Sequence, residues 1–528
     1  MRLAPPCPEG KSHSHPGGKC VGQRFSLGRR AGLLLPLSSV RGRSGDLGSY
    51  ADAGTLARWL LAGGSTLWQL IPLNEVAPGQ DSPYAASSSC ALEPVYVDLG
   101  SVEDLPGITD AEKAALDGAR AAQSVDFPAY RNVKRSALRR AFANFKARGR
   151  KDELGRFREE HRGWIEEWAL YRALHDRRQK SWRDWEPELR DRNPAALDRA
   201  RAELRDAIDE LIYVQWIADA QWRKGRKDAN ALGVKVLGDL PFMVAEDSAD
   251  VWSLQKFFRF DATVGVPPDE YSADGQNWGL PVPRWDEMRA QGDPWLRLRA
   301  ERAAELYDAF RVDHVVGLYR TYARPIDRSP PYFVPAEEPL QRQQGERILA
   351  LLGEKAGVLA EDLGTVPDFV RASLAAQEIP GTKVLRWEND KGVPRDVTKL
   401  PRVSVVVTGT HDTESLWTWW EGLPQWEREQ QLNQPPLQRL RGPDQGRFTP
   451  RTKSALLELA CSASSDALLT PITDALGRRD RMNTPGTVGT HNWTWRLPWT
   501  IDQLFTEPEP VATARELAHL AERYDRKR

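Results

Sequence analysis

Residues 309–314 read Ala-Phe-Arg-Val-Asp-His, a short apolar run that ends in polar side chains. The same pattern returns downstream and upstream, at residues 234–241, 358–363, 383–388 and 403–412. Short strands that alternate with helical stretches favour a parallel sheet. Polar residues gathered where the strands end favour a barrel whose active site lies on that face. We therefore predict an α/β protein with a (β/α)8 TIM barrel.

The region before these runs has the same rhythm. Two apolar runs, Leu33–Leu37 and Leu67–Leu73, flank a helix that we expect around Ala51–Leu61. This order is strand, helix, strand at the spacing of a βα unit. Val95–Leu99 is a further short strand candidate.

Residues 110–230 differ from both flanks. They are dense in Arg, Glu, Ala and Trp, and Ile208, Leu211, Ile212 and Trp216 recur at helical spacing. We predict a mainly helical insertion here. The resulting domain prediction is a catalytic barrel over residues 31–500, interrupted by 110–230, and a C-terminal helix over 501–528.

The first thirty residues have no periodicity and are rich in Pro, Gly, Ser and basic side chains. This composition predicts a flexible N-terminal extension over residues 1–30. The segment holds Cys7, His13, His15 and Cys20, but their spacing matches no paired zinc motif. We therefore predict no metal site.

Composition excludes several classes of protein. Lys plus Arg and Asp plus Glu are both 74 among 528 residues, so no net field favours nucleic acid or an anionic membrane. The apolar run near the start is far shorter than the ~20 residues of a membrane span, and a signal peptide's apolar segment is missing. Four cysteines in so long a chain indicate reduced thiols and predict a cytoplasmic protein.

Three predicted strand ends carry carboxylates: Asp313, Glu361 and Asp412. Retaining cleavage of a glycosidic bond needs one carboxylate as nucleophile and one carboxylic acid as proton donor. Arg311 stands two residues before Asp313, so in a strand both side chains project to the same face. The positive charge of Arg311 would lower the pKa of Asp313 and keep it ionised. Acidic strand ends also bind metals or form surface ion pairs, so the residues alone leave those alternatives open.

Several motifs together resemble the amylomaltases, the 4-α-glucanotransferase or disproportionating enzymes of the α-amylase clan. The resemblance covers about residues 30 to 500. Its motifs are Phe310-Arg-Val-Asp-His, Ala360-Glu-Asp-Leu-Gly, Gly409-Thr-His-Asp-Thr, Gly238-Asp-Leu-Pro, Asp81-Ser-Pro-Tyr, Gly275-Gln-Asn-Trp-Gly and Arg481-Met-Asn-Thr-Pro-Gly-Thr.

The resemblance implies roles for the three carboxyl groups. Asp313 would be the nucleophile, Glu361 the general acid and then the base, and Asp412 the group that holds the hydroxyls of the reacting glucose. It also implies a set of substrate-binding residues around them: Tyr84, Asp239, Trp278, Arg311, His411 and Asn483.

Residues 264–277 resemble the lid loop of this family, after the third strand. Four positions depart from the expected pattern. Glu270 and Tyr271 stand where two aromatic residues are expected, and Leu280 and Pro283 replace an Asn and an aromatic residue. These departures concern stacking of the acceptor sugar, not bond cleavage.

The resemblance implies transfer of an α-1,4-glucan segment to the 4-hydroxyl of glucose or of another α-1,4-glucan, with retention and without a cofactor. Maltooligosaccharides would be donors and acceptors. Two alternatives stay open at this point: an α-glucan hydrolase of the same clan and a non-catalytic glucan-binding protein. The sequence does not predict the oligomeric state.

Overall fold

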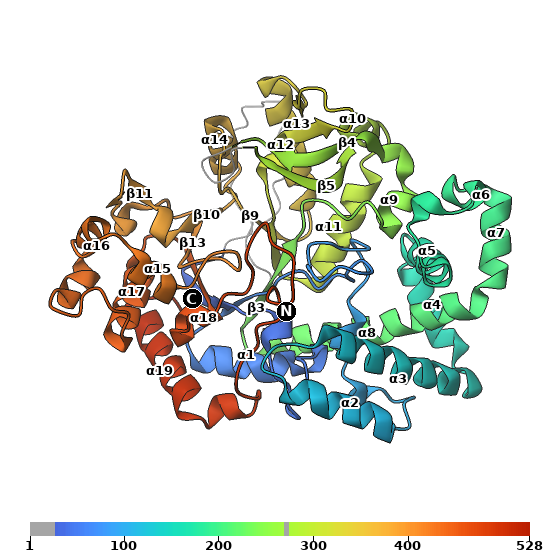
Figure 1. The fold of residues 1–528 in the computed structure, drawn as a ribbon, viewed down its shortest axis with the longest axis horizontal. Helices are drawn as coiled ribbons and strands as arrows, with labels where there is room; N and C mark the ends of the chain where they lie inside the picture. Colours follow the sequence, from blue (N-terminus) through green and yellow to red (C-terminus); the bar gives the residue numbers. More distant parts are fainter. Residues whose placement is uncertain (1–26, 269–273, 528) are drawn as a thin grey trace, which may run out of the picture.

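The computed structural model describes residues 27–268 and 274–527 and contains a closed barrel of parallel strands (Figure 1). Its strand order around the barrel is β1-β14-β13-β10-β9-β6-β3-β2. The predicted (β/α)8 barrel is confirmed. The strands are β1 (Arg30–Leu34), β2 (Leu67–Gln69), β3 (Lys235–Leu240), β6 (Ala309–Val312), β9 (Gly357–Ala360), β10 (Gly381–Val384), β13 (Ser404–Val407) and β14 (Ala467–Pro471).

One strand prediction is wrong. Residues 95–99 form parts of two short 3-10 helices, η3 (Pro94–Tyr96) and η4 (Leu99–Ser101). The Glu93 and Asp98 side chains accept backbone N–H groups at the starts of these helices, so local bonds replace strand pairing. The eighth strand is β14 instead, which was not among the predicted strands although Asp474 follows three residues after its end.

Helices cover the outside of the barrel (Figure 1). After β10, however, residues 385–403 hold only two 3-10 helices and a short hairpin of β11 (Asn389–Asp390) and β12 (Val393–Pro394). The helical layer is therefore thinner beside β10. The covering helices are α1 (Ala53–Ala62), α8 (Arg205–Ala231), α11 (Pro294–Leu306), α13 (Glu338–Leu352), α14 (Asp368–Ala376), α17 (Pro450–Ser462) and α19 (Pro508–Arg523).

The region between β2 and β3 is helical and stands to one side of the barrel (Figure 1). Thr109 caps its first helix with a reciprocal bond to Glu112. Trp168 and Tyr171 on α5 are buried, which anchors the insertion to the barrel side. The helices before α8 are α2 (Asp110–Ala121), α3 (Phe127–Ala147), α4 (Lys151–Glu160), α5 (Ile165–Arg178), α6 (Pro187–Arg190) and α7 (Pro194–Glu203).

A second, antiparallel sheet stands above the barrel after β3. Its order is β5-β4-β7-β8. Residues 264–266 and 276–277 of the predicted lid loop are the ends of β4 and β5, since Gly265 pairs with Asn277 and Val266 with Gln276, while residues 267–268 and 274–275 lie outside the strands. Glu270 and Tyr271 lie outside the described residues. The strands are β4 (Phe258–Val266), β5 (Gln276–Pro283), β7 (Thr321–Pro325) and β8 (Tyr332–Val334).

The first and last described residues meet on the barrel wall, where Arg30 pairs with Lys527. Leu27 is buried, and Arg29 donates to the carbonyls of Ala463, Ser465 and Tyr524. Thus the last four residues of the predicted extension are packed, and the rest lies outside the described residues. In the predicted C-terminal helix, α19 is preceded by a 3-10 turn at Gln503–Phe505 and packs on α1 and α17.

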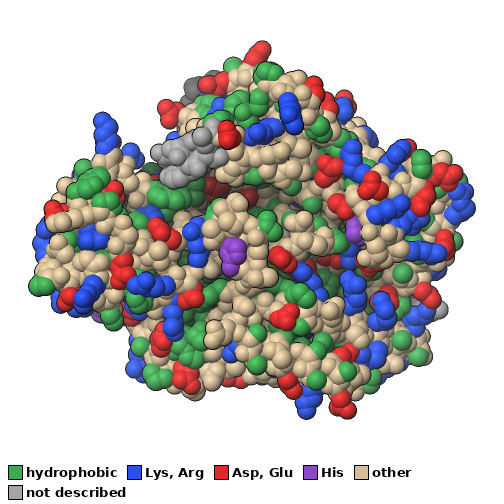
Figure 2. Space-filling model, viewed as in Figure 1, with side chains coloured by type: hydrophobic (Ala, Val, Ile, Leu, Met, Phe, Trp, Pro, Cys, Tyr) green, Lys and Arg blue, Asp and Glu red, His purple; other side chains and the backbone are tan. Residues whose placement is uncertain are grey.

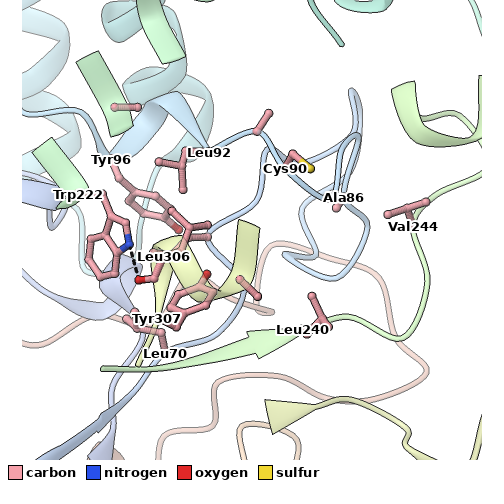
Figure 3. Close-up of a cluster of buried hydrophobic side chains, with 14 of the residues drawn as sticks. Leu70, Ala86, Cys90, Leu92, Tyr96, Trp222, Leu240, Val244, Leu306 and Tyr307 are labelled. Atoms are coloured by element: carbon pink, nitrogen blue, oxygen red, sulfur yellow. Dashed lines mark hydrogen bonds between the residues drawn. The ribbon is translucent and has the colours of Figure 1, made fainter. Parts of the chain in front are cut away.

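A buried aromatic cluster supports the loops above β2 and β3 (Figure 3). Trp222 of α8 is fully buried, and its Nε1 donates to the carbonyl of Leu306 at 3.0 Å. A buried Trp removes ~200 Å² from water, which stabilises the fold by ~5 kcal/mol. Gly238 on β3 is required here, since a Cβ would lie 2.2 Å from the Tyr307 ring.

The described residues limit two further functions. None of their helices is both long and apolar enough to cross a membrane. They also hold no group of three or more His, Cys, Asp or Glu side chains arranged to take a metal ion. The Cys7, His13, His15 and Cys20 set lies outside the described residues.

Candidate active site

Two neighbouring parallel strands carry the first pair of carboxyl groups. In the β6–β9 register Arg311 faces Leu359 and Val312 faces Ala360, so Asp313 and Glu361 follow side by side. Neighbouring strands lie ~4.8 Å apart. That spacing suits the ~5–5.5 Å between the two carboxyl groups of a retaining glycosidase.

Arg311 ties Asp313 to the barrel interior. Its Nη1 lies 2.9 Å from Asp313 Oδ1 and 2.8 Å from Asp239 Oδ2. Asp239 is 1% exposed and sits behind Arg311. Burial opposes the guanidinium charge, but the two carboxylates outweigh it and raise the pKa of Arg311 well above its ordinary value. A permanent cation therefore faces the Asp313 carboxylate.

Glu361 is set up as an acid. Burial, helped by the charge of Asp313 and opposed by that of Arg311, raises the pKa of Glu361 from 4.5 to about 7. Backbone N–H groups of His314 and Leu363 donate to its two oxygens at 2.8 and 3.0 Å. These two bonds hold the carboxyl group in one orientation, and burial, which outweighs them, lets a large fraction of it keep the proton near neutral pH.

His314 adopts a rare backbone conformation between these groups. Its φ of 45° lies in the left-handed region, which non-glycine residues seldom occupy. Its ring meets Trp278 edge to face, with centroids 4.7 Å apart. Burial lowers the pKa of His314 to about 4, so the ring is neutral. The turn aims the His314 N–H at Glu361 and links the acid to β5, which carries Trp278.

Asp412 follows β13 and faces the pair from another side of the barrel. Asn483 Nδ2 donates to its Oδ1 at 2.6 Å, and His411 Nε2 lies 3.3 Å from its Oδ2. Burial would raise the pKa of Asp412, but the His411 charge and these hydrogen bonds hold it well below its usual range. Asp412 is therefore ionised.

Tyr84 joins the two halves of this network. Its hydroxyl donates to Asp239 Oδ2 at 2.7 Å and lies 3.1 Å from His411 Nε2. The Tyr84 and His411 rings stack with centroids 5.3 Å apart, and Trp493 packs against both. Burial raises the pKa of Tyr84 well above its ordinary value, so the phenol stays protonated.

An open cavity of ≈ 380 Å³ joins these side chains to the antiparallel sheet. The space-filling view is hollowed near its centre (Figure 2). Gly265, Val266 and Gln276 line the cavity from β4 and β5. Among the predicted site residues, five line it directly: Trp278, Arg311, Asp313, Glu361 and Asp412.

The other four predicted residues form a layer behind the cavity. Tyr84, Asp239, His411 and Asn483 bond to its lining residues or to one another. Sequence reasoning missed several lining residues. His314 and Thr410 stand within quoted motifs and were within reach of it. Tyr322, Phe333 and Trp387 come from inserted strands and a 3-10 turn, where no motif marks them.

The fold and the site together define a class. A parallel barrel that presents a cation-paired carboxyl group, a carboxyl group with a raised pKa and a third, ionised carboxylate after its strand ends is typical of barrel enzymes that act on glycosidic bonds.

Comparison with known proteins gives the particular family. Residues 35–502 match the family described as 4-alpha-glucanotransferase. The 4-alpha-glucanotransferase of Thermus thermophilus is 33% identical over 94% of this chain and 100% of its own length. The chloroplastic/amyloplastic 4-alpha-glucanotransferase of Solanum tuberosum is 31% identical over 89% of this chain and 82% of its own.

A solved structure agrees. The amylomaltase from Streptococcus agalactiae, in complex with acarbose, has a TM-score of 0.82 and 25% identity, and the match covers 94% of this chain and 99% of that one. This chain belongs to the 4-alpha-glucanotransferase family. The resemblance noted in the sequence is confirmed, and so is the expectation of a glycosyl-transferring enzyme.

Proposed function

We propose that this enzyme transfers α-1,4-glucan segments by a retaining double displacement, with Asp313 as nucleophile and Glu361 as acid and base. One observation carries the proposal. The two carboxyl groups follow the neighbouring strands β6 and β9 side by side, a guanidinium lies 2.9 Å from Asp313, and burial raises the pKa of Glu361 to about 7.

In the first step an Asp313 oxygen attacks the anomeric carbon of the donor. The bond from that carbon to the glycosidic oxygen breaks as the Asp313 ester forms. Glu361 gives its proton to the departing oxygen, so the leaving sugar departs as an alcohol. The charge of Asp313 raises the pKa of Glu361, so this pKa falls when Asp313 becomes an ester. Glu361 therefore stays ionised and can act as a base in the next step.

In the second step an acceptor replaces the leaving sugar. Glu361 takes the proton of the acceptor 4-hydroxyl, whose oxygen attacks the anomeric carbon and releases Asp313. Two inversions give net retention of the α configuration. Glucose and α-1,4-glucans carry the required hydroxyl, so both are proposed acceptors, and maltooligosaccharides are proposed donors.

Asp412 is the proposed holder of the ring hydroxyls of the reacting glucose. It is ionised, and Asn483 and His411 fix its orientation. Tyr84 is proposed to pack on that glucose. Asp239 is proposed to position Arg311 and Tyr84, because it is buried and bonds to both of these side chains.

Transfer requires that a sugar, rather than water, meets the intermediate. A bound acceptor has a high effective concentration at the reacting carbon. Trp278 lines the cavity from β5 and offers a flat apolar face to an acceptor. We propose that β4, β5 and Trp278 hold the acceptor and limit water there.

We also infer that the enzyme works in the cytoplasm. Cys90 and Cys461 are free and buried, and burial raises the pKa of both thiols, which keeps them unreactive and reduced. A reducing compartment suits such thiols.

The test is direct trapping of the ester. Glu361→Gln is incubated with α-maltosyl fluoride, whose fluoride leaves without a proton, while the missing base slows the second step. Intact-mass analysis is expected to show one added maltosyl unit, located on the peptide that contains Asp313. An adduct on another residue, or inverted anomers in the first products by NMR, would overturn the proposal.

A further inference from the structure

Trp387 stands at the rim of the catalytic cavity and is unusually exposed. It follows β10 in a 3-10 turn (Leu385–Trp387) and is 46% exposed. It lines the catalytic cavity together with Asp313 and Glu361. It also lines a second, open groove of ≈ 750 Å³. One indole therefore connects the reaction centre with a separate groove.

The groove exists because the helical layer is thin beside β10. Its residues come from α14, from β10 and from the segment 387–401, which holds the β11–β12 hairpin in place of an α-helix. Arg371 of α14, Lys383 of β10 and Arg395 of the segment 387–401 all line it. These lining residues place the groove next to β10, beside the reaction centre with which it shares Trp387.

The groove is lined by charged side chains that are only loosely paired. Lys383 lies 3.6 Å from Asp362, Arg395 lies 3.9 Å from Glu388, and Lys399 lies 3.6 Å from Asp396. Ion pairs at such distances are weak and leave donors and acceptors available. A flat apolar ring beside polar groups of both signs suits a sugar, which has an apolar face and a rim of hydroxyls.

The hairpin beside the groove is held in place from outside. Asn389 Oδ1 accepts the N–H of Gly392 at 3.1 Å. Gly392 has a φ of +82°, a left-handed conformation that favours glycine, and lies against the Trp426 ring. A wall that is fixed before a ligand binds loses little freedom on binding.

We propose that this groove binds a distal part of an α-1,4-glucan chain whose reacting end lies in the catalytic cavity, with Trp387 stacking on a sugar at the junction. The inference rests on the proposed function, because it assumes that the cavity takes a glucan. It commits to a glucan because the groove shares Trp387 with the catalytic cavity and combines apolar surface with charged side chains, as the two faces of a sugar require. Long chains reach the groove and short ones do not.

The first test compares chain lengths. kcat/KM is measured for maltotriose and for maltoheptaose with Trp387→Ala and with Arg395→Ala, which removes a groove residue that is absent from the catalytic cavity. We expect the maltoheptaose-to-maltotriose ratio to fall about 2- to 10-fold in each variant, the range of one aromatic or polar contact. Trp387→Phe should restore most of the ratio.

Phe505→Ala is the matched control, since Phe505 is an exposed aromatic residue (41%) that lines neither cavity. Its ratio should equal that of the wild type. An unchanged ratio in both Trp387→Ala and Arg395→Ala, or an equal fall in Phe505→Ala, would overturn the groove assignment.

A binding measurement separates this inference from the proposed function. Asp313→Asn blocks turnover, so calorimetry can compare maltoheptaose binding with and without Arg395→Ala added. Weaker maltoheptaose binding with unchanged maltotriose binding supports the groove, and equal binding of both sugars to both proteins contradicts it. If the wild type instead fails to transfer sugar from maltotriose, the proposed function fails, while the binding result still decides the groove.

Discussion

The protonation state of Glu361 gives the sharpest quantitative prediction. Its pKa is raised from 4.5 to about 7, and only the protonated form can release a sugar. Raising the pH from 6 to 8 lowers the protonated fraction from about 0.9 to about 0.1, so kcat/KM for maltotriose should fall about tenfold. With an ordinary pKa the fraction would already be about 0.03 at pH 6.

The assay compares two donors across pH 5 to 9. Maltotriose needs a proton on its leaving oxygen, whereas α-glucosyl fluoride does not, so the alkaline fall should appear only with maltotriose. Glu361→Gln serves as the control and should lose the pH dependence together with most of the maltotriose activity, about 100-fold or more. Equal alkaline falls with both donors, or no fall on maltotriose between pH 6 and 8, would refute the reasoning.

Three further predictions concern the groups around the acid. Because the folded state keeps Glu361 protonated up to about pH 7, the wild type should lose ~3 kcal/mol of unfolding free energy relative to Glu361→Gln as the pH rises from about 4.5 to 7; urea titrations at several pH values check this. Asn483→Ala removes the 2.6 Å bond to Asp412 and should lower kcat about tenfold with little change in melting temperature; an unchanged kcat would contradict the role of Asp412. His314→Gly keeps access to the left-handed conformation, so its free energy of unfolding, measured with urea, should exceed that of His314→Ala by about 1 kcal/mol. The reverse order would contradict the backbone as the source of the stability difference.

The barrel could be predicted from the sequence because apolar runs that end in polar residues are typical of parallel strands. Runs such as residues 309–314 and 403–412 place their polar ends on one face, which brings Asp313 and Asp412 to one site. The strand at 467–471 was not predicted, although Thr473 and Asp474 follow it as polar residues follow the other strands. Residues 95–99 were wrongly predicted as a strand because a Val-Tyr-Val run is typical of one. The side chains of Glu93 and Asp98 instead accept nearby backbone N–H groups and turn the chain into 3-10 helices.

The site was predictable only where chemistry and motif coincide. Arg311 and Asp313 share a strand face, so their pairing at 2.9 Å follows from spacing. The burial of Asp239 and its bond to Tyr84 depend on contacts 155 residues apart along the chain, which no local pattern encodes. Trp387 is exposed beside a segment, residues 385–403, that contains no α-helix. The sequence pattern at 383–388 predicts a strand and does not show that a covering helix is lacking there.

The central claim is that a sugar, and not water, captures the intermediate on Asp313. The most direct measurement follows pure maltotriose by chromatography while counting reducing ends. Transfer exchanges one glycosidic bond for another, so the account predicts longer maltooligosaccharides and glucose with a nearly constant number of reducing ends. A steady rise in reducing ends, with all products shorter than maltotriose, would contradict the account and make the enzyme a hydrolase.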